Sequence, residues 1–144
     1  MERKAFLKTC GFACLGGGAL VVAMLEGCGS SKVIAGTIDQ SNLVIPANVF
    51  DEKNGSFKKY VVVQHPKLKY PVCVYRSTDT EYTALLMRCT HQGAELQVFG
   101  DRLECPAHGS QFSNKGQVKN GPADTNLRIF PVTIENNQLL ISLK

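Results

Sequence analysis

The chain has 144 residues, with 16 lysines and arginines, 12 aspartates and glutamates, and a formal net charge of +4. This length fits one globular domain, and a hydrophobic content of 44% with 19% charged residues excludes a disordered chain. The positive charges are scattered, with no run longer than a pair such as Lys58-Lys59. Nucleic-acid binding needs a continuous basic surface, so we expect no nucleic-acid partner.

The N-terminal residues have the layout of an export signal. Positive residues in the segment 3–8 precede an apolar stretch from Gly11 to Leu25, and small residues follow it. The apolar stretch is shorter than the ~20 residues that a membrane span needs. We therefore predict an export signal over residues 1–27, with an uncleaved membrane anchor helix as the alternative.

Two resemblances refine this prediction. Residues 3–8 read Arg-Lys-Ala-Phe-Leu-Lys, which resembles a twin-arginine export signal with Lys4 in place of the second arginine. The segment 25–28 reads Leu-Glu-Gly-Cys and resembles a lipobox, with Glu26 where a small residue is usual. The second resemblance implies a lipid on Cys28, a flexible tether over 28–32 and a folded domain over 33–144. That domain would be exported and membrane-associated on the periplasmic (extracytoplasmic) face.

Beyond the tether, short segments rich in β-branched and aromatic residues alternate with turn residues. No segment between them is long enough to predict a helix. Turn signals such as Asn54-Gly55, Gly100-Asp101 and Asn136-Asn137 favour hairpins. We therefore predict an all-β fold, an antiparallel barrel or sandwich, in which Pro131 marks an edge or a bulge. The predicted strands cover residues 33–38, 43–45, 59–64, 72–76, 83–88, 95–99, 102–104, 111–113, 129–134 and 139–143.

Three of the six cysteines lie within residues 1–28, which leaves Cys73, Cys89 and Cys105 for the domain. Three thiols cannot all pair, so metal binding by some of them is the economical interpretation. Cys73 alternates with valines and is typical of a small buried strand residue. His65, which precedes a proline, is predicted to lie in a solvent-facing loop.

One Cys and one His occur together in each of two segments, Cys89-Thr90-His91 and Cys105-Pro106-Ala107-His108. Two thiolates and two imidazoles can hold one zinc ion. Structural zinc sites prefer ligand pairs two or more residues apart, however, so the Cys-x-His spacing suits ligands of two different metals better. A zinc-stabilised β module that binds another protein stays open as an alternative.

The four residues resemble the Rieske [2Fe–2S] signature, and so do Gly93, Gly109 and the segment 121–123, which is similar to the family's proline-containing loop. The resemblance implies one [2Fe–2S] cluster per chain. It implies that Cys89 and Cys105 bind one iron, while His91 and His108 bind the other. The expected fold is a Rieske-type antiparallel β barrel or sandwich with a small cluster-binding subdomain, whose loops span about 88–113.

The chain departs from part of this family. Members from cytochrome bc and b6f complexes have an extra cysteine in each loop and form a disulfide there, where this chain has Ala94 and Ala107. They also have a Ser and a Tyr that bond cluster sulfurs; Ser110 retains the first, and Phe112 has no hydroxyl for the second. We therefore expect no disulfide brace, a cofactor-binding role for Ser110, and a potential below that of the quinol-oxidising members.

These features predict one-electron transfer to or from a redox partner protein, such as a cytochrome or a quinol-linked complex, without a substrate-transforming site. Two alternatives are the Rieske subunit of a quinol–cytochrome c reductase and the small subunit of an arsenite-oxidase-like enzyme. A Rieske-type ferredoxin of a dioxygenase also lacks the disulfide. Those ferredoxins work in the cytoplasm, and the export signal argues against them.

Overall fold

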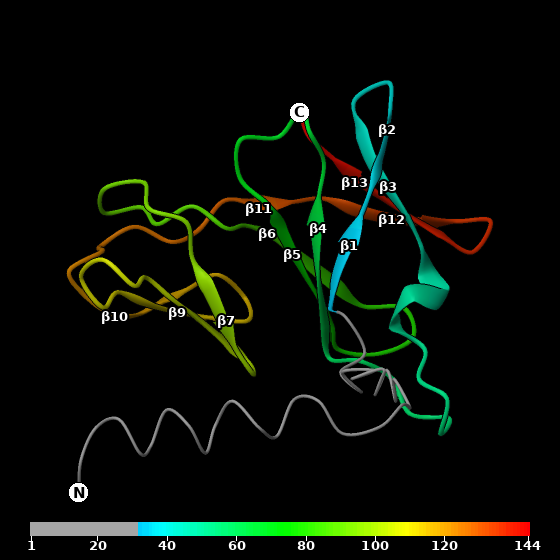
Figure 1. Ribbon diagram of the computed structural model, residues 1–144, viewed down its shortest axis with the longest axis horizontal. Coiled ribbons are helices and arrows are strands. Elements are labelled where there is room, and N and C mark those ends of the chain that lie inside the picture. Colours follow the sequence, from blue (N-terminus) through cyan, green and yellow to red (C-terminus); the bar gives the residue numbers. More distant parts are fainter. Residues whose placement is uncertain (1–31) are drawn as a thin grey trace, which may run out of the picture.

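The computed structural model describes residues 32–144, which form thirteen short strands and one 3₁₀ helix (Figure 1). This confirms the predicted all-β class. The predicted export signal (1–27), the lipid on Cys28 and the tether up to residue 31 lie outside the described residues. Within residues 32–144 there is no helix that is both long and apolar enough to cross a bilayer.

The strands form three sheets. The central sheet has the order β1-β4-β5-β6-β11 and comprises β1 (Val33–Ala35), β4 (Tyr60–Gln64), β5 (Val72–Arg76), β6 (Tyr82–Leu86) and β11 (Ile129–Phe130). The small sheet has the order β10-β9-β8-β7 and comprises β7 (Gln97–Phe99), β8 (Arg102–Glu104), β9 (Gln111–Ser113) and β10 (Val118–Asn120). The third sheet has the order β12-β13-β3-β2 and comprises β2 (Thr37–Asp39), β3 (Asn42–Pro46), β12 (Val132–Glu135) and β13 (Gln138–Ser142). The 3₁₀ helix, η1 (Ala47–Phe50), follows β3.

The central sheet lies between the other two sheets and is buried on both faces. Val61 and Val63 on β4 pack toward the third sheet, whereas Val62 between them packs toward the small sheet. Successive side chains of a strand point to opposite faces, so an unbroken apolar run is what a doubly covered strand requires. The small sheet and the third sheet lie on opposite sides of the central sheet (Figure 1). The sandwich therefore has two separate cores, and the small sheet contributes to only one of them.

Two predicted strands are each divided between two sheets. The segment 33–38 breaks at Gly36, which is buried and has no room for a side chain, since a Cβ there would lie 2.6 Å from a methyl of Leu43. The segment 129–134 breaks at Pro131, which has no N–H to donate to a ladder. Both strands beside Pro131 are edge strands, which confirms the predicted edge.

The structure corrects the predicted topology in one respect, because β1 pairs with β4 in parallel, whereas every other strand pair is antiparallel in the part of the chain described. No tight turn joins β1 to β4, so hairpin geometry does not dictate their relative direction. Neither β10 nor η1 was predicted, because each is short and has no strong local signal in the sequence.

Candidate metal centre

The first of the two segments with a Cys and a His forms a closed loop between β6 and β7, called here the first loop (Cys89–Ala94). Its two ends meet because the Cys89 N–H donates to Ala94 O at 2.8 Å and the Gly93 N–H donates to Cys89 O at 2.9 Å. Gly93 has a φ of +78°, which a residue with a Cβ adopts only with strain. The sequence Cys-x-x-x-Gly therefore specifies a tight loop that ends in a left-handed residue.

The second segment forms a loop between β8 and β9, called the second loop (Cys105–Ser110), with the same backbone pattern. The Cys105 N–H donates to Ser110 O at 2.8 Å, and the Gly109 N–H donates to Cys105 O at 3.0 Å. Gly109 has a φ of +80°. The turn at Gly100 joins β7 to β8 at the opposite end of this hairpin, as predicted, so both loops lie at one end of the small sheet.

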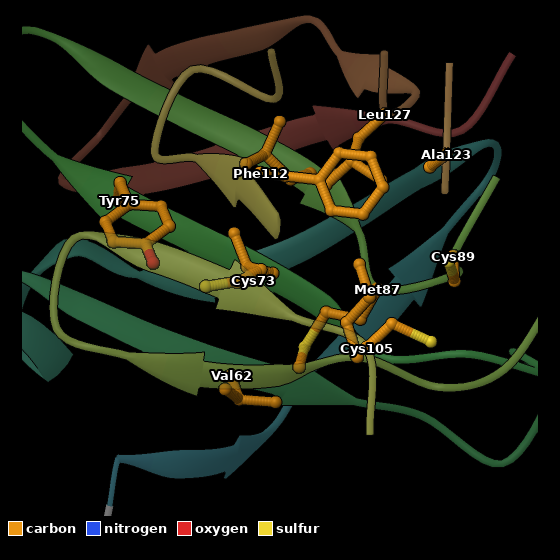
Figure 2. Packing of buried hydrophobic residues seen from close by; sticks show 12 residues of the cluster. Val62, Cys73, Tyr75, Met87, Cys89, Cys105, Phe112, Ala123 and Leu127 are labelled. Carbon is orange, nitrogen blue, oxygen red and sulfur yellow. The ribbon is translucent and has the colours of Figure 1, made fainter. Parts of the chain in front are cut away.

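The loops bring their four candidate ligands together with opposite exposures. His91 and His108 are exposed, and their ring centroids lie 5.1 Å apart with the planes at 87°. Cys89 and Cys105 are only 1% and 4% exposed and belong to the core under the small sheet. Figure 2 shows both cysteines near Met87, with Tyr75 at the far end of the same core. Two imidazoles at the surface and two thiols beneath them form the candidate site.

A third loop, residues 120–126, contacts both of the others. Ser110, which is fully buried, accepts a hydrogen bond at its Oγ from the Ala123 N–H at 3.0 Å. The Thr90 hydroxyl donates to Thr125 O at 2.6 Å. The peptide bond between residues 121 and 122 is cis. The proline-containing segment predicted from the sequence therefore lies beside the two ligand loops.

The donor set fits a two-iron cluster. Cys89 and Cys105 are free thiols, and the hydroxyl hydrogen of buried Ser110 has no acceptor among the described residues. A sulfide or thiolate sulfur would supply that acceptor. In residues 32–144 no three His, Cys, Asp or Glu side chains gather around one point. A two-iron cluster does not require three such side chains around one point, because each iron has only two protein ligands.

Cys73 and His65, which were not predicted to be ligands, also have defined surroundings in the structure. Cys73 is fully buried, as predicted, and burial raises the pKa of its thiol to about 12. His65 differs from the prediction, because it is half-buried and its Nδ1 accepts a hydrogen bond from the Lys67 N–H at 3.1 Å. A residue that precedes a proline has a restricted backbone, which favours such a local turn.

Two contacts of the site had no signal in the sequence. The Tyr70 hydroxyl donates to Gly93 O at 2.7 Å, and Asn120 Nδ2 donates to Gly109 O at 3.4 Å. A groove of about 630 Å³ also opens beside His91 and includes Arg88 and Arg128 in its lining. Neither Tyr70 nor Arg128 is close to a ligand in the sequence, so only the fold brings them to the site.

Comparison with known proteins identifies the family. The family model described as the Rieske [2Fe-2S] domain matches residues 42–131. Together with the fold and the paired Cys and His loops, this match defines an iron–sulfur protein of the electron-transfer class. The chain belongs to the Rieske [2Fe–2S] domain family, and its cofactor is a single [2Fe–2S] cluster.

Two curated relatives cover parts of the chain. The cytochrome b6-f complex iron-sulfur subunit of Prochlorococcus marinus (strain NATL1A) is 41% identical over 56 residues, which are 38% of this chain and 32% of the relative. The oxygenase component of dicamba O-demethylase from Stenotrophomonas maltophilia is 35% identical over 83 residues, 51% of this chain and 24% of the relative. The chain thus spans about a third or less of the length of these relatives.

Two solved structures share the fold over more of their length. The plasma membrane Rieske protein of the cyanobacterium Synechocystis PCC 6803 matches with a TM-score of 0.51 and 26% identity, covering 58% of this chain and 86% of that one. A chain from the complex of oxygenase and ferredoxin in carbazole 1,9a-dioxygenase matches with a TM-score of 0.54 and 25% identity. The match covers 74% of this chain and 96% of that one. The chain is therefore similar both to membrane-associated Rieske proteins and to components of dioxygenases.

Proposed function

We propose that the chain is a one-electron carrier in which Cys89 and Cys105 bind one iron and His91 and His108 bind the other. The observation that carries this proposal is the pairing of two buried thiols with two exposed imidazoles on equivalent loops. When bound, a [2Fe–2S] cluster with two imidazole ligands supplies a one-electron couple between about −150 and +300 mV.

The ligand residues have different tasks in this proposal. The buried thiols would keep the iron that they bind away from water, because Cys89 and Cys105 lie in the apolar core. The exposed imidazole edges of His91 and His108 would give a redox partner access to the iron that they bind. The partner is a protein such as a cytochrome or a quinol-linked complex, since the accessible ligands lie on the surface rather than in an enclosed substrate cavity.

The residues around the ligands favour an intermediate potential. Ser110 is buried with its hydroxyl hydrogen free for a sulfur atom, which stabilises added negative charge. Phe112, at the position of the family's second hydroxyl donor, is fully buried in the core, and its side chain has no hydrogen-bond donor. With Ala94 and Ala107 in place of the extra cysteines, we propose that no disulfide braces the loops.

The site of action in this proposal is the outer face of the cytoplasmic membrane. Residues 1–27 would export the protein, Cys28 would carry the lipid, and the domain from 33 to 144 would work beside the membrane. The layout of the leader supports this location. The similarity to a plasma membrane Rieske protein and to a cytochrome b6-f subunit agrees with it.

A second candidate is the Rieske subunit of a quinol–cytochrome c reductase. The observation that favours it is the identity of 41% with the cytochrome b6-f subunit over 56 residues. This candidate requires a high potential that falls with rising pH near neutrality. A redox titration of the purified protein between pH 6 and 9 therefore separates it from a carrier of intermediate potential.

The test of the ligand assignment is the EPR spectrum of the dithionite-reduced full chain, recorded with iron, sulfide and zinc analysis. The proposal expects a rhombic [2Fe–2S] signal with the low average g value of mixed His and Cys ligation. This signal should be absent in His91→Cys and lost in Cys105→Ser. Zinc without sulfide, and no signal, would contradict the proposal and favour a structural zinc module.

A further inference from the structure

The two left-handed glycines each have a carbonyl that is held by a side chain from outside its loop. Gly93 O accepts from the Tyr70 hydroxyl at 2.7 Å, and Gly109 O accepts from Asn120 Nδ2 at 3.4 Å. Tyr70 lies in the connection between β4 and β5, and Asn120 ends β10. Because the two loops share one backbone pattern, these donors occupy equivalent positions, and the Tyr70 bond is the shorter.

The bond from Tyr70 restrains a particular peptide group. The Gly93 carbonyl and the Ala94 N–H belong to the same planar unit, so a donor that holds the carbonyl also fixes the direction of the N–H. Ala94 O is already occupied by the Cys89 N–H at 2.8 Å. The Ala94 N–H itself has no acceptor among the described residues. It is therefore held in a fixed orientation and is free to donate.

The surroundings of Tyr70 tie the first loop to the central sheet. Pro71 O accepts a hydrogen bond from the Met87 N–H at 3.0 Å, just before the first loop begins. The Tyr70 ring also lies near two cations, with Lys69 Nζ 5.5 Å and Arg88 Cζ 5.8 Å from its centroid. Residues 70 and 71 thus fasten both ends of the first loop to the β4–β5 connection.

The side chains of Tyr70 and Arg88 also pack closely against Gly93. A Cβ at Gly93 would lie 3.2 Å from Arg88 Nε and 3.6 Å from the Tyr70 hydroxyl oxygen. At Gly109 a Cβ would meet no atom within 4 Å. The first loop is therefore packed against Tyr70 and Arg88, whereas the matching part of the second loop is open.

We propose that Tyr70 is a positioning residue for the [2Fe–2S] cluster, fixing the first loop where other family members use a disulfide. This inference rests on the proposed ligand function of Cys89 and His91. Tyr70 holds the Gly93–Ala94 peptide so that its N–H stays available to a sulfur atom. Hydrogen bonds to the sulfurs raise the reduction potential of such clusters, so the loss of this restraint lowers it.

The test compares Tyr70→Phe with Tyr75→Phe in the full chain purified with its cluster. Tyr75 is a matched control, because its hydroxyl also donates to a glycine carbonyl, Gly100 O at 3.2 Å, at the far end of the β7–β8 hairpin. Both changes remove one hydroxyl and keep the ring. The measurements are the reduction potential, the EPR g values and the rate at which a chelator bleaches the cluster absorbance.

The expected result is specific to Tyr70. In Tyr70→Phe the potential falls, the g values shift, and bleaching is about fivefold faster, as expected from the loss of one partly buried hydrogen bond. Amide hydrogen exchange in residues 89–95 also becomes faster. In Tyr75→Phe the potential and the g values stay those of the unchanged protein.

Two results would overturn the inference. If Tyr70→Phe has the potential and g values of the unchanged protein, Tyr70 does not position the site. If both variants shift equally, the hydroxyls act only through general stability. A purified chain with no [2Fe–2S] signal overturns the ligand assignment itself, whereas a normal signal that Tyr70→Phe leaves unchanged overturns only the role of Tyr70.

Discussion

The first loop (Cys89–Ala94) and the second loop (Cys105–Ser110) have the same two backbone hydrogen bonds and a left-handed glycine at the same position. They differ in the side chains that this shared backbone presents. His91 follows its cysteine by two residues and His108 by three, and the loops end in an alanine and a serine respectively. The backbone pattern thus explains the shape of both loops, and the side chains make them chemically distinct.

The two loops also differ in how the rest of the protein holds them. The second loop is fastened from inside, because Ser110 is fully buried and accepts the Ala123 N–H. The first loop is fastened by the partly buried bond from the Tyr70 hydroxyl to Gly93 O and by an exposed bond from the Thr90 hydroxyl to Thr125 O. A buried hydrogen bond is costly to break, whereas water replaces an exposed one easily. We therefore expect the end of the second loop at Ser110 to be more rigid than the part of the first loop around Thr90.

The largest effect is expected from removing one of the proposed ligands. Cys105→Ser replaces a thiolate with a weaker iron ligand and should abolish the cluster, whereas Cys73→Ala in the same core should retain it. Both thiols are buried, at 4% and 0% exposure, so the comparison separates ligation from core packing. Iron and sulfide analysis of the two purified variants checks this. Equal iron contents would contradict the assignment of Cys105.

The next effect concerns the residues that end the loops. Ser110→Ala removes the proposed sulfur donor and leaves the buried Ala123 N–H without its acceptor, at a cost of about 1–3 kcal/mol in stability. The potential should fall by on the order of 60 mV, since that is about 1.4 kcal/mol for one electron. Ala94→Ser introduces a hydroxyl at the equivalent position of the first loop. Protein-film voltammetry and thermal unfolding measure both variants.

An unchanged potential in Ser110→Ala would show that the serine hydroxyl only anchors the third loop. A rise in the potential of Ala94→Ser would show that the two loop ends are equivalent toward the cluster.

A smaller effect is expected at the two glycines. Gly93→Ala and Gly109→Ala both place a Cβ on a left-handed residue, which costs about 1–2 kcal/mol. Gly93→Ala should be the more destabilising, because its Cβ also approaches Arg88 Nε at 3.2 Å. Denaturant unfolding of the two variants checks the order. Equal losses would mean that Arg88 moves aside without cost.

The last prediction is that the Cys73 thiol does not react with an alkylating reagent in the folded protein. Its pKa of about 12 means that well below one in a thousand of these thiols is ionised at pH 8.5, and the thiolate is the reactive form. Iodoacetamide should therefore leave Cys73 unmodified in the folded protein and alkylate it after denaturation. Mass spectrometry of the peptides distinguishes the two states. Rapid alkylation in the folded protein would show that the core under the small sheet opens readily.

Local patterns were sufficient to predict much of the fold. Val72–Arg76 was predicted with its observed bounds, because an unbroken apolar run flanked by turns favours a core strand. Gly100 and the asparagines at 136–137 were predicted as turns, and all three have a positive φ. The division at Gly36 had no local signal, since it depends on contact with Leu43 and Val63 from other strands.

At the candidate site, too, contacts between residues that are distant in the sequence could not be predicted. The proposed ligand pairs and their glycines are close together in the sequence, so their resemblance to the Rieske signature could be seen from local spacing. Tyr70 lies 23 residues from Gly93, and Thr90 lies 35 residues from Thr125, so these contacts arise only from the folded topology. Ser110 was predicted as a partner of the cluster, and its bond to the Ala123 N–H is a second role that the sequence does not indicate.

The central claim is that two thiolates bind one iron and two imidazoles bind the other. Pulsed EPR of the reduced full chain, labelled with ¹⁵N at histidine only, tests it most directly. The account predicts hyperfine couplings from two histidine nitrogens, and both couplings persist in His65→Gln, which changes the one histidine that is not assigned as a ligand. A reduced cluster signal without any coupling to histidine nitrogen would contradict it.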